Sequence, residues 1–302
     1  MLVGCNRLSD LVIGTVRTQS SDSLVTDSAS SATAFACGNA SGGRLGPIGV
    51  DDNGIPVASI LEAAHLSGLR TGLVVTTRLS HATPACKTVD YVLNGYFIMI
   101  EASLLAYIKQ YIDSHPDTHL LSAADHECGG LTLEDGYNPT ALQGANHTFE
   151  YLGQLFGDYK GNKGAYLKDK LLPMYGLLDV SSDNIEALVK IAQDRGVGAL
   201  GVAAGNLLAS EAGLHWSTEG HTAADVVLYG YANKDALRAM KDLIGRNINN
   251  NDIPLYIEEV LGLSLADTTR ALRKDGVDWV GRRDELHLVK RAGKARARGH
   301  DH

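Results

Sequence analysis

The chain has 302 residues, of which 44% are hydrophobic and 21% are charged, so it can bury the core of one large domain or two small ones. A net charge of −8 argues against general nucleic-acid binding. No stretch approaches the roughly 18 consecutive apolar residues of a membrane span, and the N-terminus lacks the pattern of a secretory signal. The four cysteines match neither a zinc ribbon nor a disulfide framework. We therefore expect a soluble globular protein.

Strands and helices are predicted to alternate along the chain. Apolar runs predict strands at residues 24–27, 70–77, 95–101, 118–124 and 225–232. A small-residue helix is expected to start after residue 27, and helical spacing of apolar residues predicts further helices at 55–68, 103–115, 181–196, 234–244 and 253–262. This alternation predicts an α/β fold around a largely parallel sheet.

Polar residues follow the ends of four predicted strands. They are Asp27-Ser28, the loop from His81 to Thr83, Glu101, and Asp125-His126. In open α/β sheets, ligands bind at the edge formed by the carboxyl ends of the strands. Because packing alone explains four such positions poorly, we expect a functional site at this edge.

Each motif taken alone also has a structural explanation. Ser28 would meet free N–H groups at a helix start, which favour an alkoxide or a phosphate, but capping of that helix by Asp27 or Ser28 is the more common role. Glu101 could bind a cation or form a salt bridge. Thr83 could supply an oxygen to Mg²⁺ or be a turn residue before proline, and the structural role is favoured for it.

Each of two histidine motifs, taken alone, allows both a metal-binding and a structural interpretation. The adjacent Asp125 and His126, on a turn before two glycines, could point at one cation, although such pairs bind metal in a minority of cases. His221 could bind zinc or cap the strand that follows it, and the structural role is favoured.

Five segments together are similar to the alkaline phosphatase family, with the greatest similarity to its fungal vacuolar type. VTDSASSATA (25–34) resembles the nucleophile motif, and the resemblance runs from about residue 10 to about residue 278. Four more blocks follow in the order of the family: TTRLSHATPA (76–85), FIMIEAS (97–103), SAADHECGGLTL (122–133) and EGHTAADVVLYGY (219–231). The resemblance implies a three-layer α/β sandwich that hydrolyses small phosphate monoesters and usually forms a homodimer.

The resemblance also implies a role for each matching residue. Ser28 would be the nucleophile that becomes phosphoserine, with Asp27 as its orienting neighbour. Two Zn²⁺ and one Mg²⁺ would be bound in the family's site, and two bound metals can activate the serine and clamp the phosphate. The implied metal-site residues are Ser28, Asp125 and His126 for the second zinc, His221 for the first zinc, and Glu101 and Thr83 for magnesium with His81 in its outer shell.

The sequence also departs from the pattern of the family. An Asp near the family's N-terminus has no counterpart here, and neither the Asp-x-x-x-His pair after the Glu101 block nor the phosphate-binding Arg after the HATPA motif is found. Ser31 stands where the family usually has Gly. A catalytic zinc needs about three protein ligands, so the alternative to an active enzyme is an impaired or inactive remnant that at most binds metal or phosphate.

A sulfatase or phosphodiesterase with the same superfamily fold is a less favoured interpretation of the sequence.

Domain organisation and compartment follow from the same features. Residues 1–281 are expected to form an incomplete alkaline phosphatase-like domain, and residues 282–302 a basic, disordered tail in preference to a tether for anionic lipid or nucleic acid. Sequons at Asn39 and Asn146 and the family resemblance indicate a vacuolar or lumenal protein. The chain is expected to begin after the membrane anchor of fungal members, which leaves its own compartment unknown.

Overall fold

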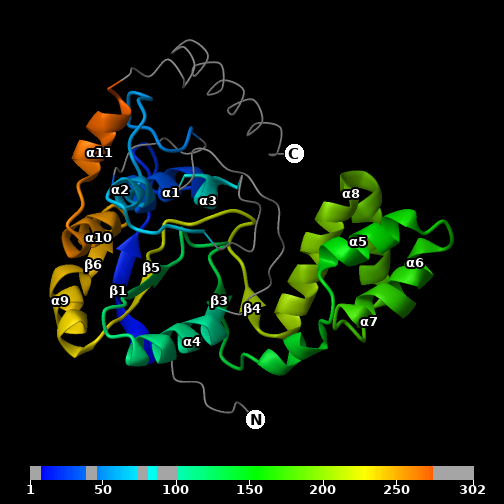
Figure 1. Ribbon diagram of the computed structural model, residues 1–302. Coiled ribbons are helices and arrows are strands. Elements are labelled where there is room, and N and C mark those ends of the chain that lie inside the picture. The colour runs from blue at the N-terminus through cyan, green and yellow to red at the C-terminus, as the bar shows by residue number, and fades with distance from the viewer. Residues whose placement is uncertain (1–7, 39–45, 74–80, 87–100, 275–302) are drawn as a thin grey trace. The chain divides into compact units, whose positions relative to one another are not determined.

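The computed structural model describes residues 8–38, 46–73, 81–86 and 101–274 (Figure 1). Contacts divide the chain into two compact units. Unit 1 comprises residues 1–127 and 221–302, and unit 2 comprises residues 128–220. The predicted tail at residues 282–302 lies outside the described residues. The prediction of one domain over residues 1–281 stays a prediction.

Unit 1 contains a four-stranded sheet in the order β2-β5-β1-β6 (Figure 1). The strands are β1 (Val12–Arg17), β2 (Leu120–Ala123), β5 (Val226–Tyr231) and β6 (Asn247–Asn249). β5 runs antiparallel to both β1 and β2, whereas β6 runs parallel to β1. The described sheet is therefore mixed, where a largely parallel sheet was predicted, because its central strand β5 runs opposite to both of its neighbours.

Helices cover both faces of this sheet. On one face, inward residues of β5 join a core with α9 (Lys234–Ile244), α10 (Asp252–Leu261) and Phe35 of α1 (Ser28–Cys37). On the other face, Leu120 and the tyrosines of β5 pack with Leu105 and Ile112 of α4 (Glu101–Ser114) and with Leu11 of a 3-10 helix (Leu8–Leu11). The predicted three-layer α/β arrangement is thus confirmed.

Gly230 in β5 shows how closely the first face is packed. A Cβ added at Gly230 would lie 2.5 Å from Cδ1 of Ile13 and 2.6 Å from Sδ of Met240. Any larger residue would have to displace these core side chains. The glycine in this strand therefore allows α9 to approach the sheet.

The remaining helices of unit 1 are α2 (Ile60–Leu66), α3 (Ala82–Ala85) and α11 (Leu265–Leu272). α2 starts with a capping box, in which Ser59 accepts a hydrogen bond from the N–H of Glu62 and the Glu62 carboxylate accepts one from the N–H of Ser59. It lies within the helix predicted at residues 55–68. The predicted helices at 103–115, 234–244 and 253–262 and the strands at 118–124 and 225–232 are likewise confirmed.

Other predicted elements differ or lie outside the description. Residues 24 and 25 form a bend and residues 26 and 27 have no regular structure, where a strand was predicted. Ser23 Oγ accepts the N–H of Val25 and Ser20 Oγ donates to the carbonyl of Ser23, so local hydrogen bonds take the place of strand pairing. Of the predicted strand at 70–77, residues 70–73 have no regular structure and the rest is not described. Residues 95–100 are not described, and Glu101 begins α4 where it was predicted to end a strand.

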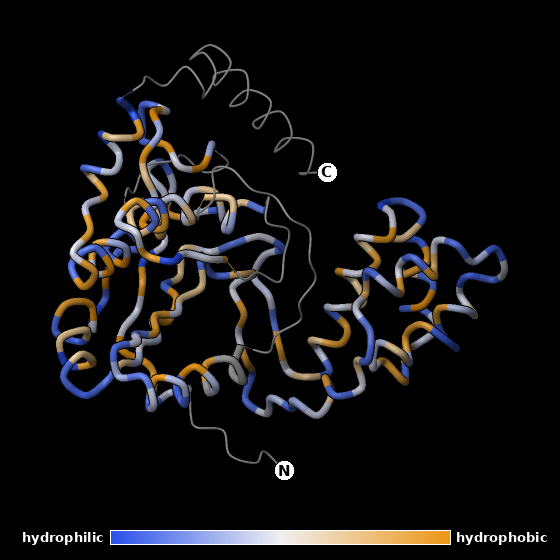
Figure 2. Tube along the Cα trace, in the orientation of Figure 1, coloured by the Kyte–Doolittle hydropathy of each residue, from blue (hydrophilic) through white to orange (hydrophobic). Residues whose placement is uncertain are grey.

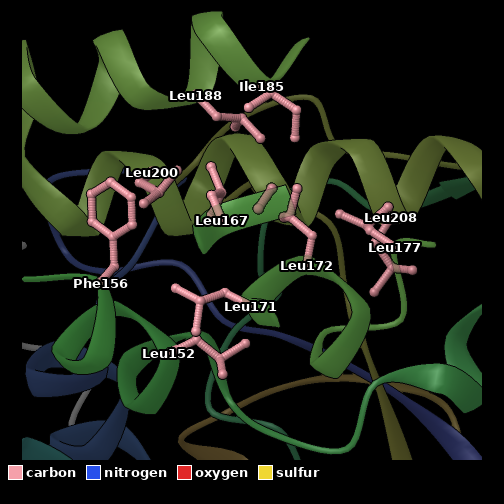
Figure 3. Packing of buried hydrophobic residues seen from close by; sticks show 11 residues of the cluster. Leu152, Phe156, Leu167, Leu171, Leu172, Leu177, Ile185, Leu188, Leu200 and Leu208 are labelled. Atoms are coloured by element: carbon pink, nitrogen blue, oxygen red, sulfur yellow. The ribbon is translucent and has the colours of Figure 1, made fainter. Parts of the chain in front are cut away.

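Unit 2 is mainly helical. It consists of the antiparallel pair β3 (Thr132–Leu133) and β4 (Leu214–His215), a 3-10 helix (Pro139–Gly144), α5 (Phe149–Asp158), α6 (Lys163–Tyr166), a π-helical turn (Leu167–Leu171), α7 (Leu172–Met174) and α8 (Ser182–Glu211). Figure 2 shows hydrophobic and hydrophilic residues alternating along these helices. Leucines of the π-helical turn, α5 and α8 pack together in one core (Figure 3).

Gly196 interrupts α8. Its φ of 86° and ψ of 175° are not helical, and the helix resumes after it. Such a φ favours glycine. The predicted helix at residues 181–196 is therefore confirmed up to its glycine stop, while the continuation to Glu211 was not predicted. No helix among the described residues is long and apolar enough to cross a membrane.

Candidate active site

The candidate site lies in unit 1, where the start of α1, the helix α3 and the loops beside β2 and β5 meet. The loop after β2 carries Asp125 and His126, and the loop before β5 carries His221. These residues come from segments far apart in the sequence, yet hydrogen bonds and ring stacking link them to one another or to the residues at the start of α1. The predicted grouping of polar loops is therefore observed for these segments.

Asp27 is the N-cap residue of α1. Its backbone is extended and its Oδ1 accepts a hydrogen bond from the N–H of Ser30 at 3.0 Å. An N-cap carboxylate satisfies one free donor of the helix and interacts favourably with the positive end of the helix dipole. The structural explanation given for this motif thus holds for Asp27, and it leaves Ser28 as the first residue of the helix.

The Ser28 hydroxyl faces the imidazole of His126. Ser28 Oγ lies 2.9 Å from Nε2 of His126, although the two residues are 98 positions apart. His126 is buried, with 8% of its surface exposed, whereas Ser28 is half-buried at the helix start. The hydroxyl is therefore held against a nitrogen that can accept its proton, while its other side remains accessible.

Backbone carbonyls determine the tautomers of both histidines. His126 Nδ1 lies 3.0 Å from the carbonyl oxygen of Glu127, and His221 Nδ1 lies 2.8 Å from that of Thr26. A carbonyl only accepts hydrogen bonds, so each Nδ1 must donate and each neutral ring then has a lone pair on Nε2. The two rings also stack, with centroids 3.6 Å apart. Histidines with an Nδ1–H bonded to a carbonyl are pre-oriented as bases or metal ligands through Nε2.

Asp125 is held by two hydroxyl groups. Thr83 Oγ1 of α3 donates to Asp125 Oδ2 at 3.0 Å, and Ser31 Oγ of α1 donates to the Asp125 main-chain carbonyl. The same Oδ2 lies 3.6 Å from Nε2 of His126. The carboxylate oxygen of Asp125 and the hydroxyl oxygen of Ser28 therefore both lie near Nε2 of His126.

The other two predicted site residues are not placed in this group. His81 precedes α3 as its N-cap residue, but its side chain is exposed and makes no capping hydrogen bond. Glu101 starts α4, and its side chain lies outside the described residues. Their predicted roles as magnesium-site residues remain predictions.

Three contributors were not predicted from the sequence. The carbonyl of Thr26 orients His221, the carbonyl of Glu127 orients His126, and the Thr222 hydroxyl donates to Glu127 Oε2 at 2.5 Å. Main-chain acceptors leave no signal in residue type. Thr222 and Glu127 flank His221 and His126 directly, and this adjacency is the signal that could have drawn attention to them.

The donor chemistry of the described residues fits one cation better than two. Ser28 Oγ and Asp125 Oδ2 both lie close to Nε2 of His126, and such oxygen and imidazole donors suit zinc. His221 adds one further imidazole. Among the described residues, however, no group of three or more His, Cys, Asp or Glu side chains is arranged to hold a metal ion.

A separate cleft lies within unit 2. It has a volume of about 740 Å³, and its walls include Leu142, Tyr175, Val202, Leu214 and Trp216. Clefts of this size and mixed apolar lining commonly take small molecules. None of the predicted site residues is among its described lining residues, and the sequence analysis did not predict it.

Comparisons with known proteins agree with the fold and with the motifs. The alkaline phosphatase family profile matches residues 6–96. The repressible alkaline phosphatase of Saccharomyces cerevisiae is 25% identical, with 88% of this chain and 77% of that protein covered. The alkaline phosphatase of Schizosaccharomyces pombe is 24% identical with the same coverage.

Solved structures with the same fold include two bacterial alkaline phosphatases. The Thermus thermophilus structure matches with a TM-score of 0.71 at 16% identity, and covers 87% of this chain and 86% of its own. A cold-active alkaline phosphatase from Shewanella matches with a TM-score of 0.66 at 21% identity. This match covers 84% of the present chain and 91% of the Shewanella chain. The chain therefore has the fold of the solved alkaline phosphatases. In sequence, the chain is similar to alkaline phosphatases, through the family profile over residues 6–96 and through the two yeast proteins over most of its length.

The sequence alignments also show what the chain lacks. The alignment with the S. cerevisiae protein spans 440 positions, more than the 302 residues of this chain. The relative therefore carries internal segments that have no counterpart here. This length difference agrees with the absence of the Asp-x-x-x-His pair and of the phosphate-binding Arg from the sequence.

Proposed function

We propose that this chain hydrolyses small phosphate monoesters in a metal-dependent reaction, with Ser28 as the nucleophile that becomes phosphoserine. The 2.9 Å contact between Ser28 Oγ and His126 Nε2 carries the proposal. A serine is a weak nucleophile until a neighbouring group accepts or displaces its proton. The tautomer of His126 presents a lone pair to that hydroxyl.

The start of α1 supplies the setting for a phosphate. Free N–H groups at a helix N-terminus and the helix dipole favour a negatively charged group. Asp27 engages the N–H of Ser30 and so fixes the first turn of the helix. Ser28 as the first helical residue would then attack phosphorus while the leaving group points away from the helix.

Asp125 and His126, with the Ser28 oxygen, are the residues that would hold a zinc ion, and His221 would contribute to a second one. Thr83 and Glu101 would hold magnesium. Bound cations would supply positive charge that favours the serine alkoxide and neutralises the phosphate. The chain's own part is to orient both Nε2 atoms through the carbonyls of Glu127 and Thr26.

A second candidate function is that of a catalytically impaired relative that binds metal or phosphate without turnover. Two observations favour it. The described residues contain no cluster of three metal-binding side chains, and the alignment with the yeast relative contains internal segments that this chain lacks. A catalytic zinc with fewer than about three protein ligands would be weakly held.

One experiment distinguishes these candidates. The purified chain is assayed with a chromogenic phosphate monoester at alkaline pH, with added Zn²⁺ and Mg²⁺ and then with a chelator, beside Ser28→Ala. The proposal expects turnover that Ser28→Ala and the chelator both abolish. A folded chain that binds zinc by calorimetry without turnover would establish the second candidate. Turnover that survives Ser28→Ala would refute the nucleophile assignment.

A further inference from the structure

Two hydroxyl groups hold the Asp125–Glu127 loop from opposite ends. At its start, Ser31 donates to the main-chain carbonyl of Asp125. At its end, Thr222 donates to Oε2 of Glu127 at 2.5 Å. Each donor sits beside a site residue, because Ser31 lies three positions after Ser28 and Thr222 directly follows His221.

The two contacts differ from ordinary surface hydrogen bonds. Ser31 is fully buried, with 0% of its surface exposed, so the donor of this bond is shielded from water. Thr222 and Glu127 are half-buried and their bond joins a hydroxyl to a carboxylate, which makes it a charge-assisted bond. The Thr222 hydroxyl also accepts the N–H of Ala224 at 3.4 Å, which keeps its own loop turned.

The geometry of His126 depends on this loop. The carbonyl of Glu127 accepts from Nδ1 and so fixes the tautomer that presents Nε2 to Ser28. If the loop moved away from α1, the 2.9 Å contact would lengthen. If the main chain at Glu127 rotated, His126 Nδ1 would lose its acceptor and the tautomer of His126 would no longer be fixed.

We infer that Ser31 and Thr222 are positioning residues, which clamp the Asp125–Glu127 loop between α1 and the His221 loop and thereby place His126 Nε2 against Ser28. The inference rests on the proposed function only for its effect on turnover. The clamp itself is a property of the folded chain. Ser31 contributes the more buried of the two hydroxyl groups.

The test uses substitutions that remove each hydroxyl at little change in volume. Thr222→Val and Ser31→Ala are compared with Thr222→Ser, which restores the donor. Thr132→Val is the matched control, because Thr132 Oγ1 donates to the carbonyl of His215 and both residues belong to unit 2. Thermal unfolding shows whether each variant folds.

The first measurement does not need turnover. The His126 Nδ1–H signal is followed by ¹H–¹⁵N NMR in the full chain and assigned with His126→Gln. We expect a protected signal in the parent chain, in Thr222→Ser and in Thr132→Val, and faster solvent exchange in Thr222→Val and Ser31→Ala. Unchanged exchange in Thr222→Val, which replaces a half-exposed side chain and should fold, would overturn the clamp.

The second measurement is steady-state turnover. Loss of a group that orients a metal ligand or base typically costs about 10- to 100-fold, and we expect such a fall in kcat with KM nearly unchanged. Thr222→Ser should restore it. Turnover that depends on Ser28 but is unaffected by both clamp substitutions would overturn the inference and leave the proposed function intact. If the chain shows no turnover but Thr222→Val still speeds solvent exchange of the His126 Nδ1–H, the proposed function is refuted and the clamp is retained.

Discussion

The hydroxyl oxygen of Ser28 lies 2.9 Å from Nε2 of His126, and the imidazole is held by its other nitrogen on the carbonyl of Glu127. The relationship joins the first residue of α1 to the loop that follows β2. It converts two motifs that are individually ambiguous in the sequence into one chemical unit.

Replacing His126 with Gln should lower kcat/KM by about 100-fold, since the imidazole that would share a zinc ion with the Ser28 oxygen is lost. The stacked partner His221 would remain in place but would lack its neighbouring ring. Steady-state kinetics with a chromogenic ester would measure the change. His147→Gln removes an exposed histidine of unit 2 and serves as the control. A fall of the same size in the control would show that the loss at His126 is not specific to the site.

Replacing Asp27 with Ala should reduce the free energy of unfolding by about 1 kcal/mol, because the N–H of Ser30 loses its capping acceptor. Asp27→Ser retains a capping oxygen and should recover most of the stability. Urea unfolding followed by circular dichroism would measure both variants. Equal stability of Asp27→Ala and the parent chain would contradict a capping role.

Replacing Gly129 with Ala should destabilise unit 2 and move Trp216. The added Cβ would lie 2.5 Å from Cε3 of Trp216, and the glycine has a φ of +79°. We expect a cost of about 2 kcal/mol for the strained backbone and the displaced ring. Unfolding curves and Trp216 fluorescence, recorded in a Trp279→Phe background, would measure it.

Gly136→Ala separates the two causes at Gly129. Gly136 also has a positive φ, of +97°, but nothing lies within 4 Å of its added Cβ. It should therefore show the backbone cost without a change in fluorescence. An equal fluorescence change in both variants would argue against the contact between Gly129 and Trp216.

Replacing Tyr231 with Phe should raise the pKa of Asp113 toward its ordinary value of 3.8. The hydrogen bond from the Tyr231 hydroxyl, at 2.6 Å, and then the one from Lys109 lower that pKa in the folded chain. A lowered carboxyl pKa stabilises the fold above about pH 3.8, and this contribution is lost as the pH falls through the folded value. Carboxyl NMR titration would measure the shift, with Tyr107→Phe on the same helix as the control. If the pKa of Asp113 did not change in Tyr231→Phe, the Tyr231 hydroxyl would be excluded as the main cause of the lowered pKa.

Lys109 gives the opposite dependence on pH. Hydrogen bonds with Tyr231 and then with Asp113 raise its pKa above the ordinary value of 10.5. Its contribution to stability is therefore present below about pH 10.5 and is lost as the pH rises through the folded value. The three side chains together should support α4 most strongly between these two limits.

Local patterns in the sequence predicted the helices of unit 1 well. Residues 103–115 and 234–244 have apolar spacing, and both form helices at nearly these positions. Strand direction could not be predicted in this way, because β5 pairs with β1 and β2 through contacts between residues far apart in the chain. β1 itself was not predicted, although it lies at the centre of the sheet between β5 and β6.

The candidate site followed from the sequence only in part. The motifs identified Ser28, Asp125, His126 and His221. In the structure, Ser28 and Asp125 both contact His126, and His221 stacks on it. The orienting carbonyls of Thr26 and Glu127 are main-chain atoms and leave no trace in residue type. Likewise, Ser31 stood out as a departure from the family, but its partner became visible only when α1 and the loop after β2 were folded together.

The most direct test of this account is to locate the phosphoryl group during turnover. The chain is mixed with a phosphate monoester in the presence of Zn²⁺ and Mg²⁺, quenched in acid within milliseconds, digested, and examined by mass spectrometry. The account predicts a phosphoryl group on Ser28 in the peptide that contains the start of α1, and none in the Ser28→Ala chain. Turnover with no phosphoryl group on Ser28 at any quench time, or with one on another residue, would contradict it.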